Sequence, residues 1–373
     1  MAMARFIAES KNSQFQFDWF IRTFTINTVQ SSHFNLDDGM STLPTLPLGL
    51  HGPQDVSALG LGCMGMSDLY GASDRTESLA TLRAALNARI NLLDTGDFYG
   101  MGHNEMLIAE ALQGRRERAL VSVKFGALRG PDASWLGVDG RPAAVKNFAA
   151  YSLKRLGADH IDIYRMARLD PAVPVEDTVG AIADLVKAGW VRHIGLSEVG
   201  PQTIARAHRV HPISDLQIEY SLLSRGPEDA IFPLLKELGI GVTAYGVLSR
   251  GLLSGSRPTG VQDFRSHLPR FQGENLARNA AIAGELQAVA ASLGATATQV
   301  AIAWVMARGQ ALGVRIVPLV GSRRRTQLAD ALGAARLALS PEAMARIEAA
   351  VPRDAASGTR YAAEHMAHLD SEG

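Results

Sequence analysis

Eight short apolar runs, separated by segments with helical periodicity, constrain the fold of this chain more than any other feature. The runs have the length and composition of buried strands and cover residues 59–64, 91–95, 120–124, 161–166, 193–197, 216–220, 241–248 and 315–320. Strands that alternate with helices form a parallel sheet, and eight such units are the number that closes a (β/α)₈ barrel. The alternative is an open, doubly wound sheet.

The distribution of chemically useful residues favours the closed barrel. Candidate site residues follow the second, third, fifth, sixth, seventh and eighth runs. An open sheet would concentrate them at one switch point, whereas a barrel brings all its strand ends to one rim. We therefore predict a single (β/α)₈ domain over residues 41–373.

Turn and capping residues indicate where several elements begin. Glycines and a proline between the short apolar runs of residues 46–59 predict a β-hairpin ahead of the barrel. Asp74 with Glu77, and Thr296 with Gln299, have the spacing of helix N-caps.

Residues 1–40 differ from the rest of the chain. They show no sustained period, and no small-residue cleavage site follows a charged segment, which argues against a secretory signal. We predict a disordered leader or a start codon assigned too early.

Composition narrows the class of protein. Lys plus Arg and Asp plus Glu are both 37, so no net charge attracts nucleic acid or an anionic membrane. No apolar stretch approaches the ~18–20 residues of a membrane span. The single cysteine, Cys63, excludes an intramolecular disulfide and favours a reducing, cytoplasmic location.

The carboxyl ends of two predicted strands carry the residues of a proton-transfer site. Asp94 and Tyr99 stand at the end of the second run, and Lys124 stands at the end of the third. If these strands are parallel neighbours, the three side chains converge. Lys124 would then lower the pKa of the Tyr99 phenol, about 10 when unperturbed, and Asp94 would keep the ammonium charged.

A glycine-rich match near the first strand is not a dinucleotide fingerprint. Residues 60–65 fit G-x-G-x-x-G, but seven further residues precede any helix. A Rossmann site needs the helix to begin at once, so that its N-terminus faces the pyrophosphate.

The end of the last strand indicates an anion-binding site more clearly. Gly321 and Ser322 lead into a helix that opens with three arginines, residues 323–325. Amides, a hydroxyl and guanidinium groups at a helix N-terminus bind anions, and the inverted charge of this first turn favours a bound phosphate.

With the motif of residues 91–100 and Gly102-His-Asn-Glu105, the set Asp94, Tyr99 and Lys124 resembles the aldo-keto reductases from about residue 43 to the end. The resemblance implies NADPH as the cofactor and Tyr99, Lys124 and Asp94 as the catalytic residues, with no metal. The cofactor contacts that it implies are Cys63, Met64, Asp94, Ser197, Gln217, Tyr245, Gly246, Val247, Leu248, Arg250, Gly251, Leu253, Gly321, Ser322, Arg323 and Gln327. Among these, Ser197 and Gln217 would hold the carboxamide, Tyr245 would stack on the nicotinamide, and Gly321 to Gln327 would hold the 2′-phosphate side.

The chain departs from the family pattern at three places. Ala167 replaces the histidine that usually follows the fourth strand, Glu198 replaces an asparagine, and Asp330-Ala331 replaces Glu-Asn. The Ala-Arg pair at 167–168 is similar to the branch that contains pyridoxal reductases.

The leading functional hypothesis is NADPH-dependent reduction of an aldehyde or ketone, with Tyr99 as proton donor and a small carbonyl compound as partner. The alternatives are an NADPH-sensing binding subunit, similar to potassium-channel β subunits, and an alcohol-oxidising dehydrogenase. The substrate pocket is expected to be lined by Met64, Met66, Leu69, Phe98 and residues 250–273.

Overall fold

The computed structural model describes residues 43–67, 69–261 and 263–372, and its central feature is a closed barrel of eight parallel strands. The barrel strands are β3 (Gly60–Gly62), β4 (Leu92–Gly96), β5 (Leu120–Phe125), β8 (Ile161–Met166), β9 (Val191–Ser197), β10 (Ile213–Glu219), β11 (Gly241–Tyr245) and β12 (Ile316–Gly321). Each coincides with one of the eight apolar runs, and β12 closes the barrel by pairing with β3. The predicted (β/α)₈ fold is confirmed.

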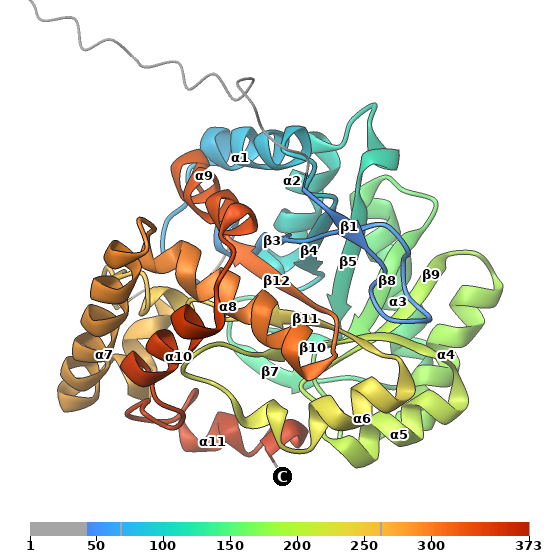
Figure 1. Ribbon diagram of the computed structural model, residues 1–373. Coiled ribbons are helices and arrows are strands. Elements are labelled where there is room, and N and C mark those ends of the chain that lie inside the picture. The colour runs from blue at the N-terminus through green and yellow to red at the C-terminus, as the bar shows by residue number, and fades with distance from the viewer. Residues whose placement is uncertain (1–42, 68, 262, 373) are drawn as a thin grey trace, which may run out of the picture. The chain divides into compact units, whose positions relative to one another are not determined.

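Helices surround the strands (Figure 1). They are α1 (Arg75–Asn87), α2 (His103–Ala111), α3 (Pro142–Leu156), α4 (Val175–Lys187), α5 (Pro201–Val210), α6 (Ile231–Leu238), α7 (Gly273–Ser292), α8 (Ala297–Leu312), α9 (Arg325–Gly333), α10 (Pro341–Ala350) and α11 (Ala363–Met366). Both predicted caps are present. The Asp74 carboxylate accepts from the Glu77 amide, and Thr296 and Gln299 form a capping box.

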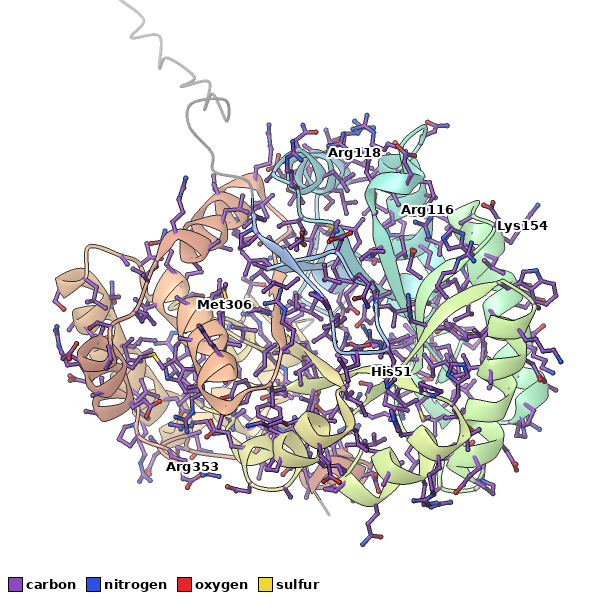
Figure 2. The ribbon with its side chains drawn as sticks, turned by 45° about the vertical axis from the view of Figure 1, so that its right-hand side comes forward. His51, Arg116, Arg118, Lys154, Met306 and Arg353 are labelled. Carbon is purple, nitrogen blue, oxygen red and sulfur yellow. The ribbon has the colours of Figure 1, made fainter. Side chains whose placement is uncertain are left out.

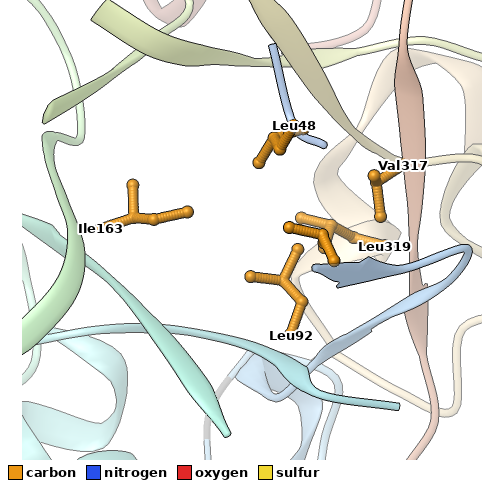
Figure 3. Packing of buried hydrophobic residues seen from close by; sticks show 6 residues of the cluster. Leu48, Leu92, Ile163, Val317 and Leu319 are labelled. Atoms are coloured by element: carbon orange, nitrogen blue, oxygen red, sulfur yellow. The ribbon is translucent and has the colours of Figure 1, made fainter. Parts of the chain in front are cut away.

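The predicted N-terminal hairpin closes one end of the barrel. Strands β1 (Thr45–Leu46) and β2 (Val56–Ser57) pair antiparallel, and the Leu50 amide donates to the Gly239 carbonyl just before β11. Apolar side chains from this segment and from three barrel strands form a buried cluster of Leu48, Val56, Leu92, Ile163, Val317 and Leu319 (Figure 3). The amino ends of the strands are thereby sealed, so the opposite end is left for a site.

A buried ion pair lies within the barrel. Arg165 of β8 donates to Asp215 of β10 at 2.9 Å, both side chains are fully buried, and Thr243 bonds to both. Such a pair needs good geometry and further hydrogen bonds to offset the loss of hydration. Ser122 and Ser214 supply two of these bonds.

A second hairpin, which the sequence did not predict, follows β5. Strands β6 (Ala127–Arg129) and β7 (Trp135–Val138) pair antiparallel, and the Trp135 side chain is 46% exposed. The strands are short and half-exposed, so they lack the buried apolar run that identified the barrel strands.

Charged side chains such as Arg118, Lys154 and Arg353 are exposed at the periphery (Figure 2). In the described part of the chain, no single helix is both long and apolar enough to cross a membrane. Only α7 and α8 taken together reach that length and hydropathy, and the chain bends by 87° at the break between them. The predicted leader at residues 1–40 lies outside the described residues.

Candidate active site

A cavity of about 940 Å³ opens at the carboxyl ends of the barrel strands. It is lined by most of the residues that the sequence predicted, namely Met64, Asp94, Tyr99, Lys124, Ser197, Gln217, Tyr245, Gly246, Val247, Leu248, Arg250, Gly251, Gly321, Ser322, Arg323 and Gln327. Cys63 and Leu253 do not line it, because both are buried behind the wall. The expected substrate-facing residues Leu69 and Phe98 line the cavity, whereas Met66 is buried below it.

Asp94 and Lys124 form an ion pair on neighbouring strands. The pairing of β4 with β5 sets Asp94 opposite Ser122, two residues before Lys124, so both charged side chains point to the same side. The Lys124 Nζ donates to Asp94 Oδ2 at 2.5 Å, and Asp94 Oδ1 accepts from Gln217 at 2.8 Å and from Ser122 at 3.1 Å. The carboxylate is therefore fixed by three donors.

Tyr99 stands beside this pair. Its side chain is 6% exposed, and the Lys124 Nζ lies 5.1 Å from the centroid of its ring. In the described part of the chain, no protein group is hydrogen-bonded to its hydroxyl, which faces the cavity. Gly96 makes room for the ring, since a Cβ there would lie 3.0 Å from Phe98 and 3.3 Å from Tyr99.

The electrostatics of Tyr99 differ from the expectation. Burial, followed by the Asp94 carboxylate, raises the pKa of the Tyr99 phenol well above its usual value. The principal opposing charge is Arg168, not Lys124 as predicted. Lys124 is occupied by Asp94, and burial lowers the pKa of its own ammonium group.

The Gly102-His-Asn-Glu motif supports the loop that carries Tyr99. Asn104 accepts from Thr95 at 2.7 Å and donates to the Cys63 carbonyl at 2.9 Å and to Ser67, and so ties β4 to the segment after β3. His103 is 2.9 Å from the Ser67 hydroxyl. The motif thus holds the loop against β4 and the segment after β3.

The end of the cavity predicted for nicotinamide is built on β9, β10 and β11. The nitrogen of the Gln217 side chain is bonded to Asp94, which leaves its oxygen to accept from a carboxamide. The Tyr245 hydroxyl bonds to Glu198 at 2.8 Å and to Tyr361 at 3.1 Å. Glu198, in place of the usual asparagine, also binds Arg360 and so anchors the C-terminal segment.

The end predicted for the 2′-phosphate lies at the start of α9. Gly321, Ser322, Arg323 and Gln327 all reach the cavity, and the Arg323 guanidinium is held by the carbonyls of Tyr70 and Ala72. A Cβ built on Gly321 would meet no atom within 4 Å, so this backbone is open to a ligand. The expectation of free amides needs correction, because Gln327 accepts from the Arg323 amide and Glu77 from the Arg325 amide.

The glycine-rich segment at residues 60–65 is followed by a 3₁₀ turn, Met64–Met66, and the first α-helix begins only at Arg75. The rejection of a Rossmann site there is confirmed.

Several cavity residues could not be identified from the sequence. They come from the second hairpin, from the end of β8 and from the C-terminal segment, and include Arg129, Trp135, Arg168, Tyr361, Glu364, His365 and His368. Only Arg168 had a signal, since it follows Ala167 at a strand end.

Comparisons with known proteins agree with this architecture. Residues 58–352 match the sequence model described as the Aldo/keto reductase family. A probable aldo-keto reductase of Glycine max is 39% identical over 316 residues, which cover 82% of this chain and 89% of that protein.

Two solved structures share the fold. A glycerol dehydrogenase from Gluconobacter oxydans superposes with a TM-score of 0.73 at 25% identity, covering 84% of this chain and 95% of that one. An aldo-keto reductase from Bacillus halodurans, solved in its holo form, gives a TM-score of 0.66 at 26% identity, covering 85% and 98%.

Proposed function

Because the chain belongs to the aldo/keto reductase family of oxidoreductases, we propose that it reduces an aldehyde or ketone to an alcohol with NADPH. The observation that carries this proposal is the Tyr99 hydroxyl, which faces the cavity beside the Asp94–Lys124 ion pair and has no protein hydrogen-bond partner among the described residues. A buried phenol with a raised pKa stays protonated at neutral pH, and that is the form a proton donor requires.

The cavity supports a nicotinamide dinucleotide as cofactor. Its volume is at the upper end of the ~300–1,000 Å³ typical of ligand sites. At one end the oxygen of Gln217 can accept from a carboxamide, and at the other the open backbone of Gly321 and the Arg323 guanidinium can receive a phosphate. The cofactor would supply the hydride.

In the proposed reaction, the protein contributes position and a proton. Tyr99 donates its phenolic proton to the carbonyl oxygen as the carbonyl carbon is reduced, and the phenolate regains a proton from water. Arg168, the principal positive charge acting on the phenol, stabilises the phenolate while it exists, and Lys124, held by Asp94, stands beside the ring. Burial lowers the pKa of this ammonium, and the Asp94 carboxylate acts in the opposite direction, in favour of the charged form.

A panel assay tests this proposal. The purified protein is incubated with NADPH and with pyridoxal, benzaldehyde and small aliphatic aldehydes, and cofactor oxidation is followed by absorbance. Pyridoxal tests the finer assignment, supported by the Ala167-Arg168 pair, to the pyridoxal-reductase-like branch. Turnover of any compound supports a reductase, while tight NADPH binding without turnover across the panel favours the binding-subunit alternative.

The reverse reaction is a second candidate. The similar structure from Gluconobacter oxydans is a glycerol dehydrogenase, an enzyme named for oxidation of an alcohol. In that direction Tyr99 would act as the base, so the raised pKa of its phenol predicts faster oxidation as pH rises. Reduction of NADP⁺ with glycerol and secondary alcohols at increasing pH measures this directly.

A further inference from the structure

Arg168 occupies an unusual position in the cavity. It directly follows Ala167 at the end of β8, is half-buried, and lines the same cavity as Tyr99 and Tyr245. Its guanidinium donates to the Ala167 carbonyl at 2.7 Å and, at 3.4 Å, to the Tyr361 hydroxyl. Within the described residues it makes no ion pair.

Two other arginines of the cavity have carboxylate partners. Arg250 donates to Glu219 at 2.9 Å and Arg265 to Asp263 at 2.6 Å. Burying a cation without an opposite charge is costly, so charged groups in such places are usually paired or bind a ligand. With five N–H donors and two protein acceptors among the described residues, the Arg168 guanidinium retains donors for a ligand oxygen.

The neighbours of Arg168 indicate which oxygen it would meet. Tyr361, which accepts from Arg168, is 3.1 Å from the hydroxyl of Tyr245, the proposed nicotinamide platform. On the other side the positive charge of Arg168 acts on Tyr99, the proposed proton donor, and lowers its pKa against burial and Asp94. The guanidinium thus lines the same cavity as the group that would deliver the proton, and is linked through Tyr361 to the surface that would carry the hydride donor.

The remaining charges near this point are already neutralised. Lys124 is paired with Asp94, and Glu198, the nearest carboxylate on the Tyr245 side, is bonded to Arg360. Ala167 offers no side-chain donor. Arg168 is therefore the cation left to respond to new negative charge in this part of the described cavity.

We propose that Arg168 is a catalytic residue that stabilises the negative charge developing on the carbonyl oxygen of the substrate. The inference rests on the proposed reductase activity. The carbonyl carbon gains a hydride, which would come from a reduced nicotinamide as its C–H bond breaks. The π electrons of the C=O bond move to oxygen, and the Tyr99 O–H bond breaks to give that oxygen its proton. The guanidinium stabilises the negative charge on the carbonyl oxygen until that oxygen has received its proton. This lowers the barrier, and the guanidinium forms no covalent bond.

The kinetic test uses Arg168→Met, which removes the charge, and Arg168→Lys, which keeps it. With a neutral aldehyde such as benzaldehyde, Arg168→Met is expected to lower kcat by about 10²–10³-fold and Arg168→Lys by less. Arg209→Met, at the exposed end of α5, is the matched control and should leave kcat unchanged. Circular dichroism and melting temperature establish that each variant folds.

A binding measurement gives a readout that does not depend on turnover. Benzoate carries a charged oxygen in place of the carbonyl, whereas benzamide is its neutral counterpart. By calorimetry, Arg168→Met should weaken benzoate binding by about 10-fold or more, as expected for loss of a charged hydrogen bond, and leave benzamide binding nearly unchanged.

The outcomes separate this inference from the proposed function. If Arg168→Met lowers turnover of 4-carboxybenzaldehyde but not of benzaldehyde, Arg168 binds a remote anionic group and the inference is overturned. If the wild-type protein reduces no carbonyl compound, the reductase proposal fails. The benzoate experiment still decides whether Arg168 binds a negatively charged oxygen there, and equal benzoate affinity in wild type and variant would overturn the inference.

Discussion

The attachment of the C-terminal segment to the barrel should depend on one guanidinium, that of Arg360. Its side chain donates twice to Glu198, at 2.9 and 3.1 Å, and also to Glu372 at 2.5 Å. Glu198 further accepts from Tyr245 and Ser371. The substitution Arg360→Met would keep most of the side-chain volume and leave this buried carboxylate without its counter-charge.

The structure sets the size of the expected loss. Although burial alone would raise it, Arg360 and its neighbours lower the pKa of Glu198 to about 2 from the usual 4.5, which corresponds to roughly 3 kcal/mol. Removing one partner of a buried ion pair typically costs about 3–5 kcal/mol. We therefore expect Arg360→Met to lower the free energy of unfolding at neutral pH by about 3 kcal/mol.

The assay is urea denaturation of the full chain followed by circular dichroism. Arg353→Met is the matched control, because Arg353 lies in the same segment but pairs with Asp229 at the surface, where the side chains are 39% and 66% exposed. That variant should cost at most about 1 kcal/mol. The double variant Glu198→Gln/Arg360→Met removes both charges and should recover part of the loss.

The pH dependence gives a second check. A carboxyl whose pKa is depressed in the folded state stabilises the protein above its unfolded pKa and loses that contribution as pH falls. The difference between wild type and Arg360→Met should therefore shrink between pH of about 4.5 and about 2. Equal losses for Arg360→Met and Arg353→Met at neutral pH would refute the reasoning.

Three further substitutions test the surroundings of the site. Burial, then the nearby Glu105 charge, raises the pKa of Asp97 to about 8, so the folded state binds a proton that the unfolded chain has lost. Stability should therefore fall as pH rises from about 4 to about 8. Asp97→Asn, which cannot ionise, should become more stable relative to wild type over the same pH range in thermal melts. In Gly96→Ala, the new Cβ would lie 3.0 Å from the Phe98 ring and 3.3 Å from the Tyr99 ring, and would displace both. The substitution should lower the free energy of unfolding, measured by urea titration, by about 1–3 kcal/mol, and should also lower kcat. Lys124→Met would leave the Asp94 carboxylate buried without a cation and should destabilise the protein by about 3–5 kcal/mol, partly restored by adding Asp94→Asn.

The barrel was predictable because its signals are local. Each strand is a short apolar run, and the starts of α1 and α8 are fixed by Asp74 and Thr296 within three residues of the amides that they cap. Parallel neighbours also bring their carboxyl ends together, so the proximity of Asp94 to Lys124 followed from the order of the strands.

The remaining parts of the site depend on contacts between distant residues. Tyr361 contacts Arg168 across 193 positions in the chain, and Arg360 reaches Glu198 across 162. No periodicity or spacing encodes such pairs. The charge on Arg165, inside an apolar run, was a local sign that a buried partner such as Asp215 had to exist.

The same limit explains the error about the Tyr99 phenol. The sequence identified Lys124, at the end of the next strand, as the cation expected beside the phenol. It could not show that Asp94 holds this ammonium at 2.5 Å, or that Arg168, which follows β8, is the principal positive charge acting on the phenol. Electrostatic effects sum over all neighbours in space, so a residue's pKa cannot be taken from one expected partner.

The most direct test of the central claim compares wild type with Tyr99→Phe at saturating NADPH, using an aldehyde that the wild type reduces. Because the substitution removes only the hydroxyl that would donate the proton, turnover should fall by about 10²–10⁴-fold while the affinity for NADPH, measured by calorimetry, stays the same. Turnover equal to that of wild type would contradict the assignment of Tyr99 as the proton donor.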